Sequence, residues 1–147
     1  MPNWVLGLVV AAGVLVAATV AGLLWQRRDG SLRGAAVEPE TKTLTELGFE
    51  PGTPATLLQF SSAFCAPCRA TRRICAEISD MLDGVRHVEV DAESHLDAVR
   101  ALGVLRTPTL FLLDRDGRIV RRASGTPTKP HLIAALAPLL EGAPAAG

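Results

Sequence analysis

Two cysteines separated by two residues are the side chains in this sequence best suited to chemistry. They lie in the segment Cys65-Ala66-Pro67-Cys68, which the apolar pattern places between a buried strand and the start of a helix. Unpaired N–H groups and the positive end of the helix dipole stabilise a thiolate there, which lowers the pKa of the first cysteine. We therefore expect Cys65 to attack a substrate disulfide and Cys68 to resolve the mixed disulfide that forms.

A CxxC pair can also be half of a zinc site, which needs four ligands. The sequence has no second CxxC, and its histidines, His87, His95 and His131, lack the spacing of metal ligands. We therefore expect no metal. The third cysteine, Cys75, lies two helical turns beyond Cys68, about 10 Å along the helix axis, which is too far for a disulfide. We expect Cys75 to be an inert buried thiol.

A second candidate segment, Thr107-Pro108-Thr109, directly precedes an apolar strand. In the expected topology its loop lies against the CxxC segment, where a cis peptide bond before Pro108 exposes the backbone of Thr107 to an extended substrate. We expect the residues around both segments to contact the substrate, namely Phe64, Ala66, Pro67, Thr107 and Pro108.

The elements that position these residues follow from changes in the period of the apolar pattern. Short apolar or β-branched runs predict strands over 55–60, 85–90, 109–113 and 118–122, and helical spacing predicts helices over 65–82, over 96–102 and from 128 onward. The segment Asp114–Gly117 ends in Asp-Gly, a strong hairpin signal. Helical crossovers make the first strands parallel and the hairpin adds antiparallel ones, so we expect an α/β fold with a mixed central sheet flanked by helices.

The N-terminal segment is apolar enough to cross a membrane. From Trp4 to Trp25 run 22 residues without a charged side chain, about 33 Å of helix against a hydrocarbon core of about 30 Å. A cleaved signal peptide is the alternative, but that class has basic residues before its apolar run, whereas here Arg27 and Arg28 follow it. We expect a retained transmembrane helix at the cell membrane. Since basic flanks stay in the cytoplasm, we place the remaining chain there, with an extracytoplasmic location as the alternative.

These patterns divide the chain into four parts: a membrane anchor (1–26), a linker with one short helical turn near residues 44–47 (27–52), an α/β domain (53–141) and a disordered tail (142–147). The 15 basic and 15 acidic side chains give no net charge, which excludes a nucleic-acid binder that works by bulk electrostatics. The three cysteines are too few for a scaffold held together by disulfides.

The motifs together resemble the thioredoxin family over residues 53–141. The resemblance rests on FCAPC after a buried strand, on VEVDAE, on GVLRTPTLFLLDRDGRIVRRASG and on the final helix. It implies a thioredoxin fold, Cys65 as nucleophile, Cys68 as resolving cysteine, Pro108 as the cis-proline beside them, and no cofactor except the redox-active disulfide. Two departures stand out: Phe64 replaces the usual tryptophan, and Gln59 replaces the buried acid of many thioredoxins.

The predicted function is therefore that of a membrane-tethered thiol–disulfide oxidoreductase that reduces disulfides in protein substrates. In the cytoplasm its electron donor would be a thioredoxin-reductase-like partner. The alternatives are an extracytoplasmic exchanger fed by a membrane electron carrier, and a non-catalytic protein of the same fold that binds metals or thiols.

Overall fold

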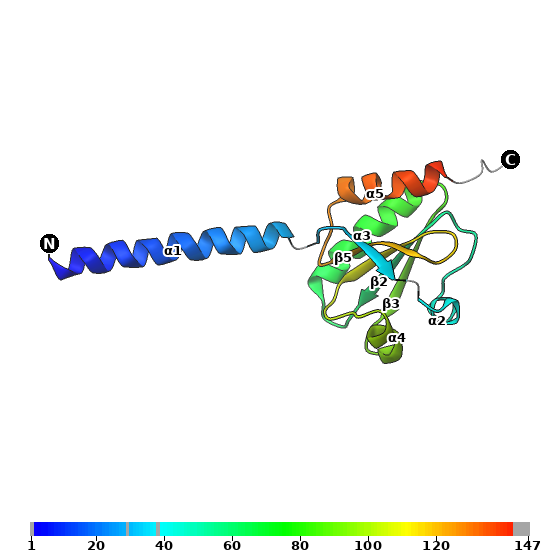
Figure 1. The fold of residues 1–147 in the computed structure, drawn as a ribbon, viewed down its shortest axis with the longest axis horizontal. Helices are drawn as coiled ribbons and strands as arrows, with labels where there is room; N and C mark the ends of the chain where they lie inside the picture. The colour runs from blue at the N-terminus through cyan, green and yellow to red at the C-terminus, as the bar shows by residue number, and fades with distance from the viewer. Residues whose placement is uncertain (1, 29, 38, 143–147) are drawn as a thin grey trace.

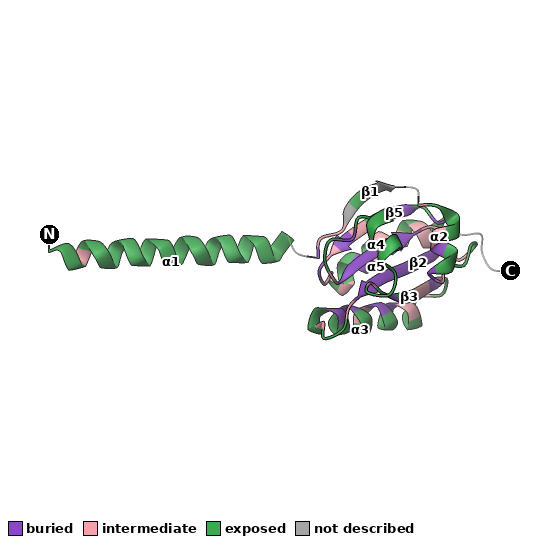
Figure 2. Ribbon diagram, turned by 90° about the horizontal axis from the view of Figure 1, so that it is seen from below, coloured by how far each residue is buried: buried purple, intermediate pink, exposed green. Residues whose placement is uncertain are grey.

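The computed structural model describes residues 2–28, 30–37 and 39–142, which form a long N-terminal helix followed by an α/β unit (Figure 1). Helix α1 (Asn3–Arg28) has no buried residue and stands away from the rest of the chain (Figure 2). Its 26 residues correspond to about 39 Å, enough to cross a bilayer or to form a signal sequence.

The centre of the α/β unit is a mixed five-stranded sheet in the described part of the chain. Its spatial order is β1 (Arg33–Val37), β5 (Ile119–Ser124), β4 (Thr109–Leu113), β2 (Ala55–Ser61) and β3 (Val85–Asp91). Strands β2 and β3 are parallel, and the other neighbouring pairs are antiparallel. The expected mixed sheet is thus confirmed.

Helices cover both faces of this sheet (Figure 1). Helices α3 (Ala66–Met81) and α5 (Lys129–Glu141) pack on one face, and the shorter α2 (Thr41–Glu46) and α4 (Leu96–Ala101) pack on the other. Successive side chains of β2 point to opposite faces of the sheet, so this strand contributes to both cores. Leu58 and Phe60 enter the core with α2 and α4, whereas Leu57 enters the core with α3 and α5. Since side chains alternate along a strand, Gln59 shares the face of Leu57 and lies beneath α3.

The β4–β5 hairpin forms where the Asp-Gly signal predicted it. The Asp114 carboxylate accepts hydrogen bonds from the backbone N–H groups of Asp116 and Arg118, both at 2.9 Å. Gly117 has a φ of 83°, a conformation that glycine adopts without a steric penalty. This hairpin places the start of β4, and therefore Pro108, beside the end of β2.

The structure differs from the expected linker over residues 27–52. Strand β1 pairs with β5, and the side chains of Leu44, Leu47 and Phe49 are buried in the core on the α2 face. An edge strand pairs through its backbone and needs few apolar side chains, so RGAAV carried no strand signal. At the other end, α5 continues through Pro138 to Glu141. Residues 143–147 of the predicted tail lie outside the described residues.

Candidate active site

The two cysteines of the CxxC segment lie at the N-terminus of α3 and are joined by a disulfide. Cys65 is the N-cap residue, and its Sγ accepts a hydrogen bond from the backbone N–H of Cys68 at 3.2 Å. Pro67 lies in the first turn, where its missing N–H breaks no helical hydrogen bond. Cys65 is partly exposed, whereas Cys68 is 1% exposed, so only Cys65 is open to a reaction partner.

The second predicted segment lies directly beside the first. The Thr107–Pro108 peptide bond is cis, and the Pro108 carbonyl accepts a hydrogen bond from the Gly125 N–H at 2.8 Å. The hydroxyl groups of Ser62 and Thr107 are 2.7 Å apart, which links the loop after β2 to the loop before β4. The structure therefore brings the two predicted segments close together, since Pro67, Thr107 and Pro108 line one cleft.

A cleft of about 380 Å³ separates these two loops. Its lining comes from four parts of the chain: Gln26, Pro67, Arg106–Pro108 and Gly125–Thr126. The hydroxyls of Thr71 and Thr126 lie 3.0 and 3.3 Å from the Pro67 carbonyl, so the wall of the cleft is held to α3. Three of the five predicted contact residues line this cleft, namely Pro67, Thr107 and Pro108. Gln26 was not predicted, since it lies 39 positions before Cys65 in the sequence and belongs to the apolar helix.

The other two predicted contact residues, Phe64 and Ala66, are exposed on the surface beside the cysteines. Phe64 is fully exposed and has a φ of 58°, which is uncommon for a residue with a side chain. Leu105 is 94% exposed and precedes the Pro108 loop. Neither side chain lines the cleft, but both are large exposed apolar groups that lie close in sequence to the two predicted segments. The exposure of Leu105 was not predicted, because its apolar type alone does not distinguish a core residue from an exposed one.

A buried amide supports the CxxC turn from below. Gln59 has no exposed surface, and its Nε2 donates to the Cys68 carbonyl at 3.0 Å and to the Ser61 hydroxyl at 2.9 Å. Its Oε1 therefore accepts, and the partner is His87 Nε2 at 3.0 Å. Burial lowers the pKa of His87, with a weaker contribution from the Arg72 charge, while the Glu89 charge opposes the shift. His87 is consequently neutral at pH 7.

Cys75 takes no part in this arrangement. It is completely buried in the core between the sheet and helices α3 and α5. Burial, together with the negative charge of Glu89, raises its pKa to about 12, so it stays a protonated thiol at neutral pH. Within the described part of the chain, no three His, Cys, Asp or Glu side chains come together as a possible metal site.

A disulfide at a helix N-terminus beside a cis-proline loop is the arrangement of a thiol–disulfide oxidoreductase. Residues 49–138 match the family model described as Thioredoxin, and the chain belongs to the thioredoxin family. Members of this family act on disulfide substrates through a redox-active disulfide, need no further cofactor, and are reduced in turn by a reductase.

Individual relatives agree with this assignment. A thioredoxin from Alicyclobacillus acidocaldarius subsp. acidocaldarius is 30% identical over 105 residues, which cover 69% of this chain and 99% of the relative. The chloroplastic thioredoxin Y of Oryza sativa subsp. japonica is 28% identical, over 90% of this chain and 76% of the relative. Among solved structures, a mutant thioredoxin from Halobacterium salinarum NRC-1 has the same fold, with a TM-score of 0.60 at 19% identity over 72% of this chain and 90% of that one.

Proposed function

We propose that this thioredoxin-family protein is a membrane-tethered reductase of protein disulfides, with Cys65 as nucleophile and Cys68 as resolving cysteine. The observation that carries the proposal is the unequal exposure of the two sulfur-bearing residues. Cys65 is accessible at the start of α3 beside the Pro108 loop, whereas Cys68 is buried behind it. A substrate sulfur can reach the first cysteine and not the second.

The proposed reaction begins from the dithiol form of the enzyme. The Cys65 thiolate attacks one sulfur of the substrate disulfide, a mixed disulfide forms, and the other substrate sulfur leaves as a thiolate that takes up a proton. The Cys68 thiol then loses its proton and attacks the Cys65 sulfur, which releases the second substrate thiol. Substrate gains two electrons and two protons, and the enzyme disulfide is reduced again by a reductase dithiol.

The substrate is proposed to bind as an extended segment across the cleft. We propose that it contacts Phe64 and Ala66, which are exposed next to Cys65 in the sequence, together with Pro67, Thr107 and Pro108, which line the cleft. Phe64 supplies a large apolar contact surface, and Thr107 supplies polar groups in the cleft wall. This mixture suits unfolded or flexible segments of proteins, because their backbone and apolar side chains are both accessible.

The membrane link rests on helix α1. Its length, its uncharged apolar run and the tryptophans at each end suit a span, with Arg27 and Arg28 in its last turn. A retained anchor with a basic flank in the cytoplasm places the α/β unit on the cytoplasmic side, where a thioredoxin-reductase-like partner supplies electrons. If the unit instead faces outward, a membrane electron carrier is the donor.

Reduction of insulin disulfides by the full chain tests the chemistry. With dithiothreitol as electron donor, the wild-type protein should speed insulin precipitation, and Cys65→Ser should abolish this activity because it removes the attacking thiol. Cys75→Ala is the matched control and should keep it, since Cys75 is buried in the core outside the site. Retained activity in Cys65→Ser would contradict the proposal.

A further inference from the structure

Few residues separate the end of helix α1 from the first residue that is bonded to the α/β unit. The backbone N–H of Gly30 donates to the Ser124 carbonyl at 2.8 Å, and a Cβ atom at Gly30 would lie 2.2 Å from the Thr126 carbonyl oxygen. Strand β1 then begins at Arg33 and pairs with β5. Two residue steps lead from Arg28, the end of α1, to Gly30, a reach of about 7 Å at most. Between the described residues Arg28 and Gly30 there is thus no long tether that would let the domain move far from the end of the helix.

This junction meets the domain at its redox site. Ser124 and Thr126 flank Gly125, whose N–H holds the Pro108 carbonyl, and Thr126 also contacts the Pro67 carbonyl. The segment that receives Gly30 is therefore the same segment that positions the cis-proline loop against the CxxC turn. Gln26, in the last turns of α1, lines the cleft between those loops.

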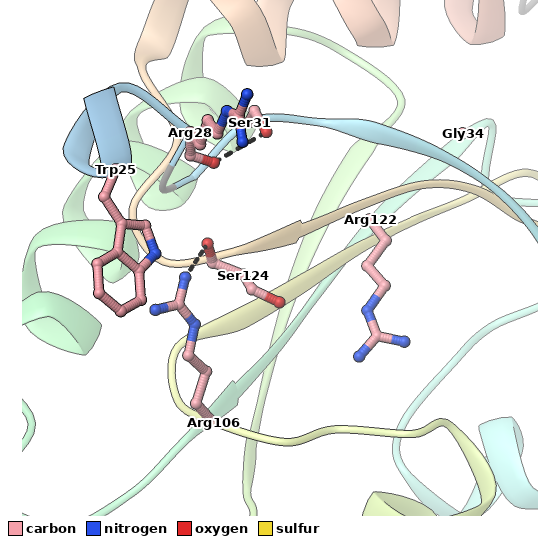
Figure 3. Close-up of a pocket in the computed structure, with 7 residues that line it drawn as sticks. All are labelled: Trp25, Arg28, Ser31, Gly34, Arg106, Arg122 and Ser124. Carbon is pink, nitrogen blue, oxygen red and sulfur yellow. Dashed lines mark hydrogen bonds between the residues drawn. The ribbon is translucent and has the colours of Figure 1, made fainter. Parts of the chain in front are cut away.

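A second cleft lies between the end of α1 and the domain, and it is lined by residues of both. Figure 3 shows Trp25 and Arg28 around this cleft together with Arg106 and Ser124. The Arg106 guanidinium donates to the Ser124 carbonyl at 3.0 Å, which joins the Pro108 loop to the same contact region. Tryptophan rings prefer the boundary between lipid and water, and arginines prefer the headgroup layer just outside it. With Trp25 at that boundary, both clefts lie at the membrane surface.

We propose that the redox site works at the membrane surface, on disulfides that a membrane-bound partner carries close to its own span. The occupant of the Gln26–Thr107 cleft is an extended juxtamembrane segment of that partner. The polar side chains of Gln26, Thr107 and Thr126 provide donors and acceptors for its backbone. This inference rests on the proposed function, because it requires α1 to span the membrane and Cys65 to exchange disulfides, and it holds whichever side the domain faces.

Because the junction is short, the protein should select substrates by the distance of their disulfide from the bilayer. Two partners in one membrane react at a high effective concentration only if their geometry allows the reacting groups to meet. A disulfide near the bilayer meets Cys65 without any movement of the domain. A disulfide held far above the surface lies beyond the reach of a domain that is joined so closely to its anchor.

Reconstituted vesicles with two synthetic probes test this selection. Both probes share one transmembrane segment and so insert alike. One carries a fluorogenic disulfide loop about five residues from the span, and the other carries it beyond a rigid helical spacer of about 30 residues, roughly 45 Å long. The full-length protein is recharged with dithiothreitol, and rates with Cys65→Ser vesicles are subtracted as background. Insulin reduction is measured in the same vesicles.

The wild-type protein should reduce the near probe about tenfold faster than the far probe. A flexible insert of 12 Gly and Ser residues directly after Arg28 spans about 19 Å and should lower this ratio to about two or less. The same insert appended after Gly147 is the matched control and should leave the ratio unchanged. Insulin reduction should be the same in all three proteins.

Equal rates on the two probes, or an unchanged ratio after the Arg28 insertion, would overturn the inference while insulin reduction still supports the enzyme. Loss of insulin reduction in the wild-type protein would overturn the proposed function and this inference with it. The two failures are therefore distinguishable.

Discussion

Gln59 is the residue at which this site departs furthest from the resemblance on which its chemistry was predicted. An amide replaces an acid, so the group beneath the CxxC turn cannot take up or release a proton. Its role in the structure is to hold the Cys68 carbonyl and the His87 ring at the same time. When Cys68 attacks the mixed disulfide, its proton must therefore pass to water or to another group. The buried amide holds its neighbours in place and takes no part in acid–base chemistry.

Replacing this amide should destabilise the fold. Gln59→Leu leaves the Cys68 carbonyl and His87 without their buried partner, so the free energy of unfolding in urea should fall by about 1–3 kcal/mol. Thr56→Val is the matched control on the same strand. The Thr56 hydroxyl is buried and has no hydrogen-bond partner among the described residues, so its removal should cause no loss. Equal stability of Gln59→Leu and the wild type would contradict the role assigned to the amide.

His87 should make stability depend on pH. Burial lowers its pKa in the folded state below the ordinary value of 6.5, so between these two pKa values the unfolded chain binds more protons. Stability is therefore fully present above pH 6.5 and decreases as the pH falls from there towards the folded-state pKa. His87→Gln keeps a donor for Gln59 but does not titrate, and its unfolding free energy should show a smaller decrease between pH 7.5 and 5. The same decrease in both proteins would assign the effect to other groups.

At the scale of elements, local patterns predicted the strands and helices from β2 to α5, and contacts between distant segments decided the rest. The CxxC turn and the Asp-Gly hairpin are local signals, so Cys65, Cys68 and Pro108 could be identified from sequence. Strand β1 could not, because its pairing with β5 depends on backbone groups and not on side-chain type. Leu44 and Phe49 were assigned to a linker, because one apolar residue inside a six-residue helix and another just after it form too short a pattern to indicate core.

The junction between α1 and β1 offers a test at this scale. Gly30→Ala places a methyl group against the Thr126 backbone at a φ of 74°, and should destabilise the domain by about 1–3 kcal/mol. Gly34 lies four residues later in β1, and a Cβ there meets nothing within 4 Å, so Gly34→Ala should change stability by less than about 0.5 kcal/mol. Urea unfolding of the two variants measures this difference. A tolerated Gly30→Ala would mean that the junction is not held as described.

At the scale of the whole molecule, one apolar helix and one redox domain are joined so that the exchange site lies at the end of the helix. The sequence separates the two parts clearly, since all charged residues follow residue 25. It does not reveal their relative placement, because Gly30 is more than 90 positions from Ser124 and Thr126 in the chain and meets them only in the folded protein. The proposed position of the redox site at the membrane surface is therefore argued from tertiary contacts and not from composition.

Acid-quenched thiol trapping in intact cells tests the central claim, a membrane-tethered disulfide reductase, most directly. A membrane-impermeant maleimide is applied first and a permeant one after lysis, in a Cys75→Ala background so that only the CxxC thiols are counted. A cytoplasmic reductase predicts that Cys65 is mostly reduced in the membrane fraction and is labelled only after lysis. Cys65 held mainly in a disulfide would contradict the reductase function, and labelling in intact cells would place the domain on the opposite side of the membrane.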